Sequence, residues 1–309
     1  MMRVVPVAVV GMVAGASLLA WQRSSIVAYF APNACGDSSV VAWEPMAPRQ
    51  GALFRVRAQG IPPSSQLAGT AMREPLHFTR IANDSTSAEA FAGIPIEGNR
   101  SIAIVVRCSS SSRSDSLSVV IEAAVADYPL EKLTVAPEFG RPPDSATSVR
   151  IRDENGRARI VAVNSHKTPR LWSEPFMLPR DSRITSGFGQ GREFNGAVTS
   201  RHMGTDFQGA SGATIRAANR GVVRLIGLFY YGGNVVYIDH GGGITSAYLH
   251  MSADSVAVGD TVARGQTIGL VGATGRVTGP HLHLIVRYGE VTVDPMSLFA
   301  IAGDSAAKR

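Results

Sequence analysis

The chain has 309 residues, of which 45% are hydrophobic and 17% charged, and its formal net charge is +6. This hydrophobic fraction is too high for a disordered protein, and the length suggests about two domains. The basic residues are almost all arginines, scattered along the chain rather than gathered in runs, which argues against a nucleic-acid-binding surface. With 32 glycines and only 7% aromatic residues, the composition favours a β protein with many turns.

The first segment has the pattern of an export signal. One positive charge, Arg3, precedes residues 4–21, which carry no charge. This arrangement is typical of a signal peptide, and the apolar stretch is also close to the roughly 20 residues that cross a bilayer as a helix. We therefore expect residues 1–22 to be a signal peptide or a membrane anchor. The rest of the chain is then exported to the periplasm or cell envelope, in an anchored form if the segment is retained in the inner membrane.

Residues 35–137 predict a small β-sandwich-like domain. Short strand-like stretches, such as 101–108, are separated by turn residues. The chain has two cysteines, Cys35 and Cys108, and in an oxidising compartment this pair is expected to form a disulfide. His77 lies between two apolar residues on an apparent strand and is expected to be structural.

Residues 138–183 are richer in charge and proline and predict a connector with one helix. Trp172 and Phe176 are expected to form a packing clasp between domains. His166 is expected to be solvated. No catalytic or binding residue is therefore predicted in this segment.

The range 184–300 predicts a second domain, followed by a short tail at 301–309. Short strands follow one another without long helical patterns, which favours an antiparallel sheet. The fold class expected for the whole chain is all-β, with a sandwich-like domain before a C-terminal antiparallel domain. The block also holds five of the seven histidines of the chain.

Three short stretches of this block carry side chains that suit a metal ion. His202 and Asp206 are four residues apart, and a bend at the glycine between them can bring both to one site. His281 and His283 occupy positions i and i+2 of a strand and therefore face the same side. Two imidazoles on an otherwise apolar strand are costly to bury without a partner or a metal. His250 ends a third stretch. Because the block has no cysteine, a catalytic site with three ligands is favoured over a closed structural site.

In combination these stretches resemble the lysostaphin-type, LytM-like zinc metalloendopeptidases of bacterial cell walls, over roughly residues 184–299. The motifs that carry the resemblance are Ser200-Arg201-His202-Met203-Gly204-Thr205-Asp206, Tyr248-Leu249-His250 and Gly279-Pro280-His281-Leu282-His283. One departure is Leu284-Ile285, where many members carry Phe-Glu, and it removes no ligand. The resemblance implies one Zn²⁺ per chain held by His202, Asp206 and His283, with catalytic roles for His250 and His281.

The function implied by the resemblance is zinc-dependent hydrolysis of peptide cross-links in peptidoglycan, with the stem peptides as substrate. One of His250 and His281 would act as the base and the other would stabilise the oxyanion, and spacing does not decide which. His240 is expected to support the fold or the site rather than to bind the metal. Tyr230 and Tyr231 can line a peptide groove or pack in the core, and so can Tyr248.

Two other functions fit the sequence less well. A catalytically silent LytM-like protein would bind the wall or activate an amidase, but such proteins generally lose a zinc ligand, and every ligand is present here. Residues 218–223 together with 258–272 also resemble a biotinyl or lipoyl carrier, but a carrier needs a lysine at a hairpin tip, and none occurs between Lys167 and Lys308. The N-terminal domain is expected to position or partly cover the catalytic groove. The sequence predicts neither the oligomeric state nor which peptide bond is cut.

Overall fold

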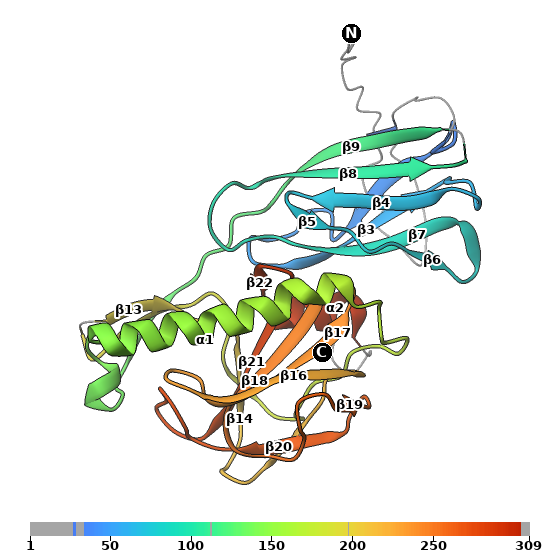
Figure 1. Ribbon diagram of the computed structural model, residues 1–309. Coiled ribbons are helices and arrows are strands. Elements are labelled where there is room, and N and C mark those ends of the chain that lie inside the picture. The colour runs from blue at the N-terminus through green and yellow to red at the C-terminus, as the bar shows by residue number, and fades with distance from the viewer. Residues whose placement is uncertain (1–26, 29–33, 112, 197, 304–309) are drawn as a thin grey trace, which may run out of the picture.

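The computed structural model describes residues 27–28, 34–111, 113–196 and 198–303 (Figure 1). A β-sandwich is followed by a linking segment with one long helix and then by a second β domain. The expected signal peptide or anchor at residues 1–22 and most of the tail at 301–309 lie outside the described residues. Among the helices described, none is long and apolar enough to cross a membrane.

The N-terminal sandwich consists of two antiparallel sheets, ordered β1-β2-β3-β7-β6 and β5-β4-β8-β9. In β8 and β9, alternate residues are buried, because successive side chains of a strand point to opposite faces and one face meets the other sheet. The predicted disulfide between Cys35 and Cys108 is present and buried in this core. The expectation of a sandwich is confirmed. Its strands are β1 Val27–Ala28, β2 Val40–Glu44, β3 Leu53–Gln59, β4 Gln66–Ala71, β5 Glu74–Pro75, β6 Thr79–Ile81, β7 Asp84–Gly93, β8 Ser101–Ser109 and β9 Ser114–Glu122.

The linking segment contributes one strand and one long helix to the second domain. Strand β10 (Leu130–Leu133) pairs in parallel with β12 (Gly191–Phe194), although β10 lies inside the range predicted for the sandwich. Helix α1 (Ser145–Asn164) begins after Asp144, whose carboxylate accepts the backbone N–H of Thr147 at 2.7 Å. The helix lies against the sheet of the second domain (Figure 1). The domain boundaries stay a prediction, but β10 belongs structurally with the second domain. Two short 3-10 turns flank α1, η1 Pro137–Phe139 and η2 Ser165–Lys167.

The second domain is built on a sheet with the central order β11-β14-β21-β18-β17-β16-β19. All of its pairings are antiparallel, which confirms the expected architecture. A smaller sheet, β10-β12-β13, stands beside it. The elements not yet bounded are β11 Ile184–Ser186, β13 Val198–Arg201, β14 Thr205–Gln208, β15 Thr214–Arg216, β16 Gly221–Phe229, β17 Gly233–Gly241, β18 Ile244–Asp254, β19 Thr261–Val262, β20 Thr267–Val271, β21 His281–Tyr288, β22 Val291–Val293 and α2 Pro295–Ala302.

A buried hydrogen-bonded chain runs through the middle of this sheet. His240 is fully buried, and its Nδ1–H donates to the Arg220 carbonyl at 2.9 Å. On the other side of the ring, Ser246 Oγ lies 2.8 Å from Nε2 and 3.1 Å from the Tyr248 hydroxyl, which also accepts the N–H of Ala218. Burial lowers the pKa of His240 to about 4, so the ring is neutral at pH 7. His240 therefore supports the fold, and Tyr248 packs in the core.

The two domains meet through an apolar interface. Trp172 packs on Phe91 of the sandwich with ring centroids 5.9 Å apart, and on Phe176 at 4.8 Å. These rings belong to the core cluster of the second domain, which also includes Leu53 of strand β3. The backbone N–H of Leu53 donates to Ser297 Oγ of helix α2 at 2.8 Å. The predicted clasp between domains is confirmed.

His166 is not solvated, and that expectation was wrong. Its side chain is 11% exposed, with Nδ1 at 2.8 Å from His77 Nε2 and Nε2 at 2.7 Å from the Glu74 carboxylate. Burial, and then the neighbouring His166, lower the pKa of His77. Because Glu74 and His77 belong to the sandwich, this polar chain is a second tie between the domains.

The pKa of His240 predicts how stability depends on pH. The unfolded chain takes up a proton at this residue near pH 6.5, whereas the folded chain resists it until about pH 4. The free energy of unfolding should therefore fall as the pH decreases through this window, by about 3 kcal/mol from this group. In His240→Gln, the slope of that free energy against pH should drop by about one proton, roughly 1.4 kcal/mol per pH unit. The slope is measured by urea unfolding at several pH values between 4 and 7, followed by circular dichroism.

Ser246→Ala is the matched control, because it removes a hydrogen-bond partner of the ring but leaves the ring to titrate. It should lower stability at every pH without changing the slope. An unchanged slope in His240→Gln would show that another group sets the acid limit.

Candidate metal centre

Strand register brings the predicted site residues together. In the antiparallel pair β14–β21, Asp206 lies opposite His283, and Gln208 lies opposite His281. On the other side of β21, Leu249 of β18 lies opposite His283, so the next residue of β18 enters the same region. Residues from three adjacent strands therefore meet at one place. The register of an antiparallel pair cannot slip by one residue without turning its side chains to the other face.

Three buried side chains direct one atom each to a common point. His202 Nε2 lies 3.0 Å from Asp206 Oδ1 and 2.9 Å from His283 Nδ1. The third side, from His283 Nδ1 to Asp206 Oδ1, is 2.7 Å. These residues form the group that can hold a metal ion in the described part of the chain, and they are the three predicted as ligands.

The protonation of these groups suits a cation. A neutral imidazole has one N–H, and in His202 the Gly187 carbonyl accepts it from Nδ1 at 2.6 Å, so Nε2 presents a lone pair. Burial lowers the pKa of His283 to about 4, so the His283 ring is neutral at pH 7. Burial alone would raise the pKa of Asp206, but contacts with His202 and His283 hold it well below the usual range. Lone pairs this close repel unless a cation or a proton lies between them, and a donor set of two nitrogens and one oxygen fits zinc.

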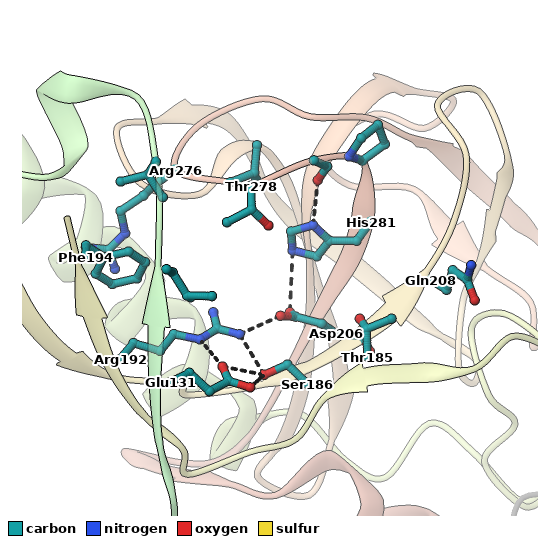
Figure 2. A pocket seen from close by; sticks show the side chains of 15 residues that line it. Glu131, Thr185, Ser186, Arg192, Phe194, Asp206, Gln208, Arg276, Thr278 and His281 are labelled. Carbon is teal, nitrogen blue, oxygen red and sulfur yellow. Dashed lines mark hydrogen bonds and ion pairs between the residues drawn. The ribbon is translucent and has the colours of Figure 1, made fainter. Parts of the chain in front are cut away.

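The carboxylate of Asp206 is oriented by groups that the sequence analysis missed. Arg192 Nη2 donates to Asp206 Oδ2 at 2.7 Å and to Ser186 Oγ at 2.8 Å, while Arg192 Nε lies 3.3 Å from the Glu131 carboxylate (Figure 2). Because Asp206 Oδ2 is hydrogen-bonded to Arg192, the other carboxylate oxygen, Oδ1, faces His202 and His283. These three residues lie on β12, β11 and β10, in stretches without a motif, so no local signal could have identified them.

The two predicted catalytic histidines lie beside this cluster. His250 donates its Nδ1–H to the Thr274 carbonyl, and His281 donates its own to the Gly279 carbonyl, both at 2.8 Å. Each ring therefore has its Nε2 free of this contact, and His281 Nε2 lies 3.5 Å from Asp206 Oδ1. The two ring centroids are 4.9 Å apart. The structure therefore brings all five predicted site residues together.

The backbone at His250 is strained. Its φ is +62°, in the left-handed region that non-glycine residues rarely adopt, and its N–H donates to the Gly232 carbonyl at 2.9 Å. This conformation coincides with irregular pairing along β18, where an extra residue turns the side chain into the site. Burial, followed by the like charges of His283 and His281, holds the pKa of His250 well below its usual value. The ring is therefore a neutral acceptor at pH 7.

A cavity of about 280 Å³ opens beside Asp206 and His281. Glu131, Leu133 and Val135 form one wall of it, so the linking segment, and no described strand of the sandwich, lines this space. Neither Tyr230 nor Tyr231 is among the lining residues. The lining consists of Glu131, Leu133, Val135, Thr185, Ser186, Arg192, Phe194, Asp206, Gln208, Arg276, Val277, Thr278, Gly279, Pro280 and His281.

An antiparallel β domain with a buried His-Asp-His cluster next to a cavity, and two more imidazoles in reach, defines the class of metal-dependent hydrolase sites with three protein ligands. The particular family follows from comparison with known proteins. Residues 200–295 match the family model described as Peptidase family M23. All five site residues lie within the matched range.

Named relatives agree with this assignment. The chain is 47% identical over 140 residues to peptidoglycan DD-endopeptidase ShyA of Vibrio cholerae, a match covering 44% of this chain and 30% of that protein. It is 39% identical over 117 residues to the DD-carboxypeptidase/endopeptidase Mpg of Neisseria meningitidis, covering 38% of this chain and 27% of that one. The chain thus spans about a third or less of the length of these curated relatives.

One solved structure is similar over most of the chain. A crystal structure from Pseudomonas aeruginosa, described as an M23 peptidase, superposes with a TM-score of 0.62 at 26% identity. The match covers 81% of this chain and 94% of that one. The similarity therefore extends beyond the region of the family model.

Gly204, in the bend between His202 and Asp206, has no room for a side chain. A Cβ there would lie 2.4 Å from the Leu284 carbonyl oxygen and 2.6 Å from His283 Nε2. We expect Gly204→Ala to displace the His283 ring and weaken divalent-metal binding at least tenfold, measured by competition with a fluorescent chelator.

Gly187→Ala is the matched control near the same cluster, because a Cβ at Gly187 would meet nothing within 4 Å. This variant should bind metal like the wild type. Equal metal binding by Gly204→Ala and the wild type would mean that the His283 ring does not need its present position.

Proposed function

We propose that the protein is a zinc-dependent endopeptidase that hydrolyses peptide cross-links of bacterial peptidoglycan. The observation that carries the proposal is the convergence of His202, Asp206 and His283 beside a cavity that also receives His281. The M23 domain and relatives named as peptidoglycan DD-endopeptidases support both the reaction and the substrate class.

In this proposal His202 Nε2, Asp206 Oδ1 and His283 Nδ1 hold one Zn²⁺. When bound, the ion supplies an activated water and polarises the scissile carbonyl. The protein holds the ligands in place before the ion arrives. The Gly187 carbonyl fixes the tautomer of His202, and Arg192 fixes the rotation of the Asp206 carboxylate.

His250 and His281 are proposed to handle the protons. Each ring has its Nδ1–H donated to a backbone carbonyl, so Nε2 is the atom that can accept a proton. A ring that has taken a proton becomes an imidazolium, which can protonate the leaving amine or donate a hydrogen bond to the oxyanion. Two imidazoles at one site can divide these tasks.

The complete set of site residues favours an active enzyme over the silent alternative. A wall-binding or amidase-activating protein has no need for five converging ligand and acid–base groups. The whole cluster is best explained by hydrolysis, because the His250 and His281 rings, whose Nδ1 atoms are bonded to backbone carbonyls, leave Nε2 for proton transfer rather than for holding the metal. The experiments below separate the two functions.

We also propose that the chain works outside the cytoplasm, in the periplasm or cell envelope. The Cys35–Cys108 disulfide supports an oxidising compartment. The apolar stretch at residues 4–21 supports export as a signal peptide or an anchor. The peptide cross-links that the enzyme would cut are found in that compartment.

The first test compares zinc content and cleavage in the wild type and His283→Ala. The wild type should carry about one zinc per chain and cleave cross-linked muropeptide dimers. The variant should lose both properties, with cleavage reduced by at least a thousandfold, because it lacks one of three ligands. Elemental analysis and mass spectrometry of the products make the measurements.

The masses of the products identify the bond that is cut. A wild type that binds no zinc would overturn the proposed cofactor. Stoichiometric zinc with no cleavage of any wall substrate would favour the silent, wall-binding function.

Removing the proposed proton-transfer groups should separate metal binding from catalysis. We expect His250→Ala and His281→Ala to retain about one zinc per chain, because neither ring is a proposed ligand. The value of kcat should fall by at least a hundredfold in each, the usual range for lost general acid–base catalysis. Steady-state kinetics with parallel zinc analysis tests this, and a variant that loses zinc would have to be reassigned as a ligand.

A further inference from the structure

A second arginine, Arg276, lines the cavity and packs against two aromatic rings. The carbon of its guanidinium lies 4.0 Å from the centroid of the Phe194 ring and 4.1 Å from that of Tyr231. Figure 2 shows Arg276 beside Phe194, across the cavity from His281. A planar cation packed against two rings cannot turn freely, so its N–H groups are held in fixed directions.

The two arginines of the cavity differ in how their charges are balanced. Arg192 contacts the carboxylates of Glu131 and Asp206. Within the described residues, the guanidinium of Arg276 has no ion pair and no side-chain hydrogen bond, although the backbone N–H of Arg276 donates to the Tyr231 carbonyl at 2.9 Å. The negative charges that line the cavity are thus engaged by Arg192, and the positive charge of Arg276 is not compensated.

Keeping this charge without a partner is unfavourable. Burial lowers the pKa of the Arg276 guanidinium to about 10, which still leaves it protonated at neutral pH. The two rings offset part of the desolvation cost of the guanidinium, because a cation is attracted to an aromatic face. They offer no hydrogen-bond acceptor to the N–H edge, however. A rigid, partly desolvated guanidinium that lines a cavity is well suited to bind a planar anion with two parallel hydrogen bonds.

We propose that Arg276 binds a carboxylate of the peptide substrate and makes the enzyme selective for cross-links that carry free acids. This inference rests on the proposed function and names a specificity residue for it. A peptide has a free carboxylate at its C-terminus unless that group is amidated, so the proposed substrate class can supply the anion. Because Arg276 and His281 line the same cavity, a carboxylate bound at Arg276 would orient the neighbouring amide towards the metal centre.

The test uses two muropeptide dimers that differ only in whether their carboxylates are free or amidated. Arg276→Gln should lower kcat/KM for the acid dimer by about 10- to 100-fold, mainly through KM, the range expected for losing a charged hydrogen-bond pair. The amidated dimer should change less than threefold. Arg152→Gln, which removes an exposed arginine of helix α1, is the matched control and should leave both dimers unaffected.

Direct binding keeps this inference separable from the proposed function. Calorimetry on the His281→Ala background, with and without Arg276→Gln, measures the affinity for each dimer whether or not cleavage occurs. Tighter binding of the acid dimer that disappears with Arg276→Gln supports the subsite. If both dimers bind equally to the parent protein, or if Arg276→Gln weakens both equally, the subsite is overturned.

Arg276→Lys provides a second variant in case the glutamine disturbs the aromatic stack. The lysine keeps the charge but not the planar edge, so it should retain part of the preference for the acid dimer. If only Arg276→Gln loses the preference for the acid dimer, and the two variants have equal thermal unfolding midpoints, the preference depends on the charge of residue 276. Equal loss of affinity for both dimers in the two variants counts against the subsite.

Discussion

The structure of the second domain depends on holding three lone-pair atoms, from His202, Asp206 and His283, within 3.0 Å of one another in a buried place. Such an arrangement is electrostatically unfavourable until a cation occupies it, so the surrounding fold must be rigid enough to impose it. Hydrogen-bonded strands provide that rigidity, because β21 is paired on both sides, with β14 and with β18. An isolated hairpin carrying the same motif would relax until the three atoms separated.

Backbone groups set the chemistry of the site as much as side chains do. The carbonyls of Gly187, Thr274 and Gly279 each accept an Nδ1–H, and so fix which nitrogen of His202, His250 and His281 faces inward. A carbonyl oxygen can only accept a hydrogen bond, so the imidazole nitrogen beside it must carry the proton. The position of the loop therefore determines the tautomer of each ring. Loop conformation around these three residues therefore matters to function, although none of the three carbonyls belongs to a catalytic residue.

The sequence could predict whatever follows from local spacing. Strand periodicity placed His281 and His283 on one face, and the four-residue spacing suggested His202 and Asp206 as a pair. Periodicity does not tell which remote strands become neighbours, so Arg192 and Glu131, on β12 and β10, could not be foreseen. The same limit explains the wrong expectation for His166, whose partners Glu74 and His77 lie about 90 residues away and in the other domain.

Strand β10 connects the sandwich to the metal centre. The Tyr128 hydroxyl, just before β10, donates to the Gln50 carbonyl of the sandwich at 2.8 Å, and its ring packs edge-on against Phe188 of the second domain. Glu131 follows three residues later and contacts Arg192, which in turn holds Asp206. A shift of the sandwich against the second domain would therefore pull on β10 and alter the support of the Asp206 carboxylate. This series of contacts gives the N-terminal domain a physical route to the site without any sandwich strand lining the cavity.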